Sequence, residues 1–164
     1  QTHILGESFS TVAPILYGAY YAKIAVVPIS PSLTALTHQH VDFADNPDGL
    51  RAAVKAYFAQ NSGVWEVRVQ LATDLEKMPI EDASVEWPEK LSPYLTVARI
   101  EVEAQDAWAS ENVEEIDDGM SFSPWHGLAA HRPLGGVMRV RKPAYEMSAG
   151  FRAEHNGCPM QEPR

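Results

Sequence analysis

The sequence has one cysteine, Cys158, among 164 residues. A disulfide within the chain or a thiolate metal cluster needs at least two thiols, so both are excluded. The chain also lacks the ~20-residue apolar run of a membrane helix and a charged-then-apolar leader at its start. We therefore expect no membrane partner. The expected compartment is the cytoplasm, and the periplasm stays open because the lone cysteine does not report the redox environment.

Positive charge is scarce, with 13 Lys and Arg against 22 Asp and Glu, which gives a formal net charge of −9. Nucleic acids and anionic membranes are bound through a basic face, so a nucleic-acid partner is not expected. Apolar residues make up 45% of the chain. A chain of this length buries about 70% of its unfolded surface, which suffices for one core. We expect a single domain over residues 1–164.

The hydrophobic pattern predicts mainly strands. Apolar and polar residues alternate in several segments, which is typical of half-buried antiparallel strands. In the segment 64–73, this alternation assigns Glu66, Arg68 and Gln70 to the solvent face. The predicted strands are one long strand over 15–29, then 64–73, 94–105 and a shorter one near 113–116.

One helix is expected before the second strand. Asn46-Pro47-Asp48 is a typical helix start, and apolar residues then recur at helical spacing up to Gln60. The proline-rich residues 74–93 are expected to be an irregular connector. Long antiparallel strands followed by helices indicate an α+β fold, here part of a β-barrel with helices packed outside it.

The last third of the chain contains a tyrosine between two arginines. Arg141, Tyr145, Ser148 and Arg152 lie at i, i+4, i+7 and i+11, so a helix would carry them on one face. A free tyrosine titrates near pH ~10, and a neighbouring cation favours its charged form. A phenolate held in this way can ligate a ferric haem iron.

Residues 112–152 resemble the proximal side of haem catalases, and most closely the C-terminal portion of the small catalase-related peroxidases. The resemblance extends over about a quarter of the chain, with the family's order and separation of motifs. The matching parts are an acidic segment at 112–118, the Phe122-Ser123-Pro124 loop, a proline-containing connector at 131–136, Arg141, Tyr145 and Arg152.

Some positions depart from the family pattern. Catalases carry Asp two residues after the tyrosine, where this chain has Met147, and basic or amide residues where it has Ala149 and Gly150. Pro143 is unusual inside a helix, so either the helix kinks there or a new turn begins at Lys142. No early residue matches the family's distal His and Asn. We therefore expect the C-terminal part of a longer catalase-like haem domain.

The resemblance implies a haem-dependent oxidoreductase, catalase- or peroxidase-like, that acts on hydrogen peroxide or organic hydroperoxides in oxidative stress. It implies that Tyr145 ligates the haem iron, that Arg141 keeps the phenol ionised, and that Arg152 pairs with a haem propionate. Phe122 and Met138 would line the proximal pocket, although both could be ordinary core residues. Without the distal group the chain alone should be inactive. Unpaired strand edges further predict a homo-oligomer.

Two alternatives remain open. A catalase-like barrel that no longer binds haem could serve as a small-molecule binding or assembly module, as the departures near Tyr145 suggest. His38 and His40, with Asp42 or Asp45, could instead hold a metal ion, since two imidazoles two residues apart are a spacing that metal sites use. Two solvated histidines in a loop would produce the same pattern.

Overall fold

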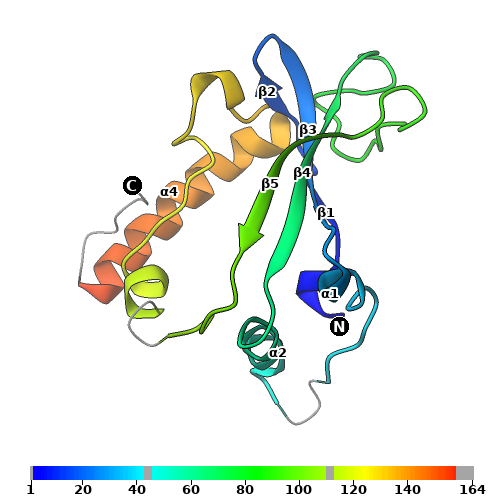
Figure 1. Cartoon of the computed structure of the whole chain (residues 1–164). Coiled ribbons are helices and arrows are strands. Elements are labelled where there is room, and N and C mark those ends of the chain that lie inside the picture. Colours follow the sequence, from blue (N-terminus) through cyan, green and yellow to red (C-terminus); the bar gives the residue numbers. More distant parts are fainter. Residues whose placement is uncertain (1, 43–45, 110–112, 158–164) are drawn as a thin grey trace. The chain divides into compact units, whose positions relative to one another are not determined.

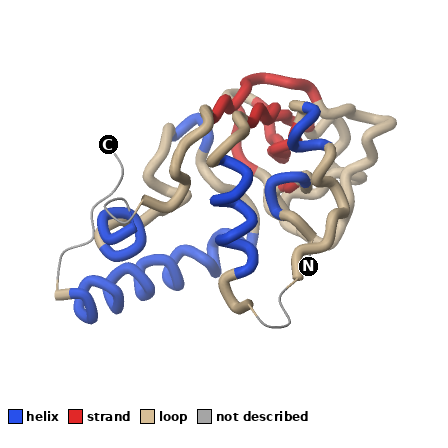
Figure 2. The backbone as a smooth tube through the Cα atoms, turned by 60° about the horizontal axis from the view of Figure 1, so that its bottom comes forward, coloured by secondary structure: helices blue, strands red, loops and turns tan. Residues whose placement is uncertain are grey.

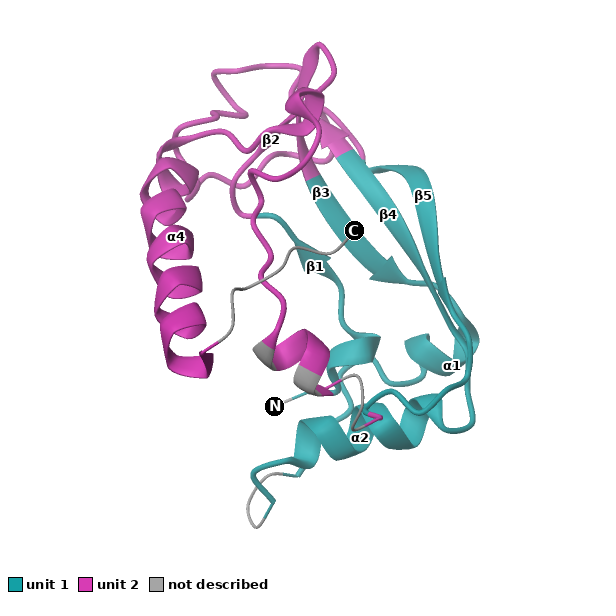
Figure 3. Ribbon diagram, turned by 90° about the vertical axis from the view of Figure 1, so that its left-hand side faces the viewer, with its two compact units in different colours: residues 1–11, 24–69, 94–108 teal, residues 12–23, 70–93, 109–164 magenta. Residues whose placement is uncertain are grey.

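The computed structural model describes residues 2–42, 46–109 and 113–157. The chain divides into two compact units, coloured separately in Figure 3. Unit 1 comprises residues 1–11, 24–69 and 94–108, and unit 2 comprises residues 12–23, 70–93 and 109–164. Strands β3 (Tyr20–Pro28) and β4 (Gly63–Leu71) contribute residues to both units. The expectation of one domain over the whole chain stays a prediction.

The strands form one five-stranded sheet (Figure 1). Its order is β1-β3-β4-β5, and β2 also pairs with β3. The pairings of β1 and β2 with β3, and of β4 with β5, are antiparallel. The α+β class and the antiparallel sheet are therefore confirmed, while the described strands do not close into a barrel. The remaining strands are β1 (Phe9–Ser10), β2 (Ile15–Tyr17) and β5 (Leu95–Val102).

The predicted long strand over residues 15–29 is wrong, because the chain reverses inside it. β2 pairs with β3 in a hairpin whose last partners are Tyr17 and Tyr20, which leaves Gly18 and Ala19 as a two-residue turn. Gly18 has a φ of +62°. Such turns need positive φ, which glycine adopts without steric cost. Gly18 was thus the signal of a turn within an otherwise strand-like run.

The predicted strands 64–73 and 94–105 are confirmed as β4 and β5. Their register shifts at a bulge, because Val67 faces Ala98 whereas Arg68 faces Thr96, so Val97 is an extra residue in β5. β5 is the outermost strand of the sheet order. Its residues are exposed except for the partly buried Val102.

Gln70 lies on the face of β4 that was expected to be solvated, yet only 1% of it is exposed. The connector over residues 74–93 covers that face and places two backbone carbonyls beside the amide. The Nε2 of Gln70 donates to the carbonyl oxygens of Trp87 (3.0 Å) and Ser92 (2.9 Å). Met78 and Trp87 are themselves buried. The connector is irregular as predicted, but it is packed around a buried amide.

The core of unit 1 lies around Leu33, Tyr57 and Phe58. Helix α2 (Gly49–Phe58) supplies the two aromatic residues and confirms the helix predicted within 46–60. Helix α1 (Pro31–Thr34) supplies Leu33. The hydroxyl of Tyr57 donates to the carbonyl of Ser62 at 2.8 Å, which satisfies the phenol at the edge of an apolar cluster. A short 3-10 helix, η1 (Ile4–Gly6), precedes β1.

Loops and turns connect the helices and strands over much of the described chain, as the tan segments of Figure 2 show. The long helix of unit 2 is α4 (Gly136–Asn156), with Pro143 inside it, so the alternative in which the helix begins at Lys142 is wrong. The short 3-10 helix η3 (Ala129–His131) precedes α4. Within the described ranges, no helix combines the length and the apolar character needed to cross a bilayer.

The strand predicted near residues 113–116 is also wrong. Residues Glu114–Asp118 form a π-helical turn, η2, that ends at Gly119. A Cβ atom at Gly119 would lie 2.6 Å from the carbonyl oxygen of Glu115, so the turn closes only because glycine has no side chain. The acidic segment thus forms a local turn instead of joining a sheet.

Candidate functional site

Arg141 and Tyr145 lie one turn apart on α4 and contact each other directly. The Nη2 of Arg141 donates a hydrogen bond of 2.7 Å to the phenol oxygen of Tyr145. The guanidinium carbon also lies 5.3 Å from the centre of the tyrosine ring. Guanidinium has no acceptor, so the phenol oxygen must accept this bond, and its own O–H can donate to another partner. A hydrogen bond from a charged donor is shorter and stronger than one between neutral groups.

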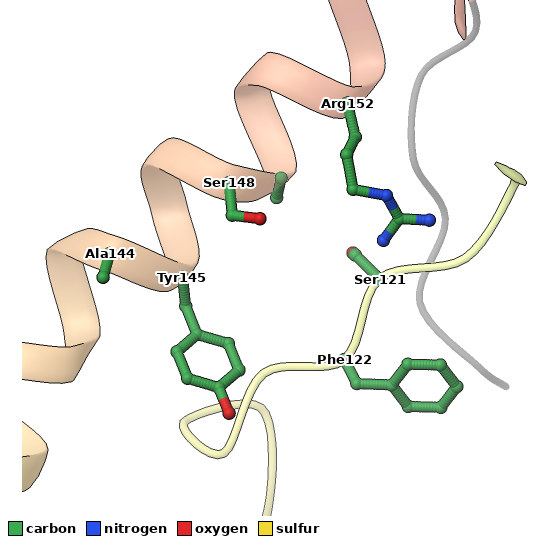
Figure 4. A pocket seen from close by; sticks show the side chains of 7 residues that line it. Ser121, Phe122, Ala144, Tyr145, Ser148 and Arg152 are labelled. Carbon is green, nitrogen blue, oxygen red and sulfur yellow. The ribbon is translucent and has the colours of Figure 1, made fainter. Parts of the chain in front are cut away.

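The phenol faces a loop formed by residues 121–126. A cavity of about 360 Å³ lies between this loop and α4. A smaller volume of about 110 Å³ adjoins Tyr145 next to Trp125. The larger cavity is lined by Ser121, Phe122, Ala144, Tyr145, Ser148, Ala149 and Arg152, most of which Figure 4 labels.

Two aromatic residues of this loop behave differently. The ring of Trp125 meets the ring of Tyr145 edge to face, with a centroid distance of 5.9 Å and an interplanar angle of 71°. Phe122 lines the cavity but is 61% exposed, and Figure 4 shows its ring turned away from α4. Trp125 was not predicted as a site residue. It directly follows the Phe122-Ser123-Pro124 loop, and this position in the sequence already placed it near the predicted site.

Arg152 does not reach toward the phenol, although it shares the helix face. Its Nη1 donates to the carbonyl oxygen of Met120 at 3.2 Å, and its Nη2 donates to the carbonyl oxygen of Asp117. The guanidinium therefore points from α4 toward the chain just before Ser121 (Figure 4). The predicted pairing of Arg152 with a haem propionate stays a prediction, and in this structure the side chain binds the backbone.

Met138 is buried on α4, with 8% of its surface exposed. Its sulfur lies 3.8 Å from the Nη1 of Arg141, so the thioether contacts the guanidinium. Met138 is not among the described residues that line the two cavities beside Tyr145. The structure thus places it beside the arginine of the pair, where it packs as a core residue.

A salt bridge holds the start of α4. Arg139 donates to both carboxylate oxygens of Glu81, at 3.0 and 2.7 Å. The hydrogen bonds from the Arg139 guanidinium hold the pKa of the Glu81 carboxyl below its usual value. Gly135 precedes the helix with a φ of +86°, and a Cβ there would lie 2.6 Å from the carbonyl oxygen of Ile80. The start of α4 is therefore fixed to the connector by contacts that sequence spacing did not reveal.

The described residues of the alternative metal site are not brought together as a ligand set. The side chain of His38 is 84% exposed, and its Nδ1 lies 3.6 Å from Glu7. His40 takes part in an isolated bridge with Thr2. Asp45 lies outside the described residues. Over residues 2–42, 46–109 and 113–157, no group of three or more His, Cys, Asp or Glu side chains could hold a metal ion.

The residues around Tyr145 fit a haem bound through that tyrosine. A phenol oxygen is a known axial donor to haem iron, and here it accepts from a cation. The adjoining cavity of about 360 Å³ falls within the ~300–1,000 Å³ of ligand pockets, and Phe122, Ala144 and Ala149 give it an apolar lining. Tyr145 and Arg141 would hold the group.

The structure is similar to solved catalases. A fungal catalase matches with a TM-score of 0.69 and 15% sequence identity, over 92% of this chain and 32% of the catalase. Catalase A from Saccharomyces cerevisiae matches with a TM-score of 0.62 and 15% identity, over 93% and 34% of the two chains. No protein-family model and no curated protein sequence matches. The chain thus has a catalase-like fold and spans about a third of the length of these catalases.

Proposed function

We propose that this chain is the proximal part of a haem-dependent oxidoreductase that acts on hydrogen peroxide or organic hydroperoxides. The observation that carries the proposal is the 2.7 Å hydrogen bond from Arg141 to Tyr145 on a long helix of a catalase-like fold. The proposal includes a closer relation to the small catalase-related peroxidases, a homo-oligomeric state and a cytoplasmic location.

Two residues of α4, Tyr145 and Arg141, would have different roles toward a bound haem. Bound haem would supply the iron that reacts with the peroxide. Tyr145 would bind it through the phenol oxygen, and Arg141 would stabilise the charge on that oxygen through its 2.7 Å hydrogen bond. Met138 contacts the guanidinium of Arg141 at 3.8 Å, and the ring of Trp125 packs against the tyrosine ring with a centroid distance of 5.9 Å.

Peroxide cleavage would also need a group that moves a proton, which is the distal group of the family. The residues that resemble the catalases, 112–152, do not include such a distal group, and the chain spans about a third of the length of the solved catalases. We therefore expect the 164-residue chain to bind haem without turning over peroxide. Activity is expected for a longer protein that carries the distal residues.

A hemin titration of the purified chain tests the ligand role of Tyr145. Wild type should give a saturable change in the porphyrin absorption band, and Tyr145→Phe should abolish it because the donor oxygen is lost. Tyr20→Phe is the matched control, since Tyr20 is 60% exposed and lies at the hairpin turn. A titration curve of Tyr145→Phe that overlays wild type would refute the ligand assignment.

The second candidate function is a haem-free binding or assembly module on the same fold. Two observations favour it, namely Pro143 inside α4 and the use of Arg152 on backbone carbonyls. Under this alternative the protein as expressed is colourless and takes up no added hemin. A brown protein with a porphyrin band would exclude the alternative.

A further inference from the structure

Arg152 connects α4 to the chain segment that leads into the site loop. Both of its terminal nitrogens donate to backbone carbonyls, those of Met120 and Asp117. The two carbonyls belong to the end of the π-helical turn and the residue after Gly119. The hydrogen bonds of Arg152 thus connect two segments that are more than thirty residues apart in the sequence.

Two backbone N–H groups close the turn next to the carbonyls that Arg152 binds. The N–H groups of Gly119 and Met120 both donate to the carbonyl of Ile116, the second at 3.4 Å. Gly119 permits the tight closure but supplies no side chain. Carbonyls at the end of a helical turn lack partners inside the turn, so an external donor is needed. A guanidinium with five N–H donors in a rigid fork can serve two such carbonyls at once.

The position of the capped segment determines where the site loop begins. Ser121 follows Met120 directly, and Ser121, Phe122 and Arg152 line the same cavity. Trp125, four residues further, contacts the ring of Tyr145. A change at residues 117–120 would therefore shift the residues that face the phenol.

We propose that Arg152 is a positioning residue, which clamps residues 117–120 to α4 and so places the 121–125 loop against Tyr145. In this role the guanidinium acts on the polypeptide and not on a haem carboxylate. The clamp concerns the chain itself and exists without a ligand. Only its consequence for haem binding rests on the proposed function.

The first experiment measures amide hydrogen exchange in the free protein. The Met120 N–H donates to the carbonyl of Ile116, and the His126 N–H donates to the carbonyl of Ser123. Arg152→Gln should speed exchange at both amides by about tenfold, which is the effect of losing a hydrogen bond from a charged group. Arg152→Lys should give an intermediate effect, because one ammonium cannot span both carbonyls as a fork does. Arg51→Gln removes the same charge from unit 1 and should leave these amides unchanged.

Two exchange results would overturn the clamp. One is an unchanged rate at both amides in Arg152→Gln. The other is a loss of protection throughout α4 and the sheet in both Arg152→Gln and Arg152→Lys. Arg152 would then support the whole fold and not the loop in particular.

The second experiment separates the clamp from a propionate partner. Hemin and hemin dimethyl ester are titrated into wild type and Arg152→Gln. Under the clamp, the variant weakens binding of both compounds by the same factor, since the ester retains the ring but not the carboxylates. A loss confined to hemin would overturn the clamp as the basis of the effect. If wild type binds neither compound, the proposed haem function fails, and the exchange rates alone decide on the clamp.

Discussion

The strongest quantitative prediction concerns the hydrogen bond between Arg141 and Tyr145. Arg141→Leu removes the donor and keeps a helix-compatible side chain at an exposed position of α4. Hydrogen bonds to charged groups contribute about 1.5–3 kcal/mol. Arg141 is exposed and Tyr145 half-buried, so the lower end applies. A loss of about 1.5 kcal/mol corresponds to roughly tenfold weaker binding.

The assay is a hemin titration followed by absorption, with the dissociation constant as the readout. Lys142→Leu is the matched control, because it removes a neighbouring cation that lies 3.9 Å from Glu146 and is not bonded to the phenol. We expect Arg141→Leu to weaken binding about tenfold and Lys142→Leu to leave it nearly unchanged. Arg141→Lys should lose less than Arg141→Leu, because the positive charge remains.

General loss of positive charge is the competing explanation. It predicts equal effects of Arg141→Leu and Lys142→Leu, and that result would refute the role assigned to the hydrogen bond. In a Tyr145→Phe background, the Arg141→Leu substitution should add nothing to whatever residual binding remains, since its partner oxygen is already gone. An undiminished effect in that background would also contradict the reasoning.

Two further predictions concern the supporting structure. Gln70→Leu leaves the carbonyls of Trp87 and Ser92 without their donor, which should cost about 2–5 kcal/mol in urea unfolding, whereas Gln39→Leu at an exposed amide should change little. Burial lowers the pKa of His3 below 6.5, so the unfolded chain takes up a proton there first as the pH falls. Stability should therefore decrease from about pH 7.5 toward pH 5, and a His3→Gln variant with the same pH dependence as wild type would contradict this.

Local features were the ones that the sequence could predict. The 49–58 helix follows from a start signal and a helical repeat within a dozen residues. The contact between Arg141 and Tyr145 follows from i, i+4 neighbourhood once α4 is recognised. Strands β4 and β5 follow from alternation within each segment. In all of these, the deciding residues lie close together in the chain.

The failures have two different causes, one distant in the chain and one local. Gln70 was assigned to solvent because the alternation in β4 does not report that residues some twenty positions later cover that face. The strand expected near residues 113–116 has no local signal against it except Gly119, whose role depends on the close approach of the Glu115 carbonyl. Coverage of β4 by a distant segment is not encoded in its alternation, whereas the turn at Gly119 depends on residues that lie close together in the chain.

The behaviour of Arg152 nevertheless follows from helix geometry once direction is considered as well as spacing. Side chains on a helix lean toward its N-terminus, so the phenol of Tyr145 extends toward Arg141 and away from Arg152. Seven residues of helix rise add about 10 Å between the Tyr145 and Arg152 backbones. The phenol oxygen can therefore accept from only one of the two arginines, and the other guanidinium needs a different set of acceptors. The backbone carbonyls of Asp117 and Met120 supply them.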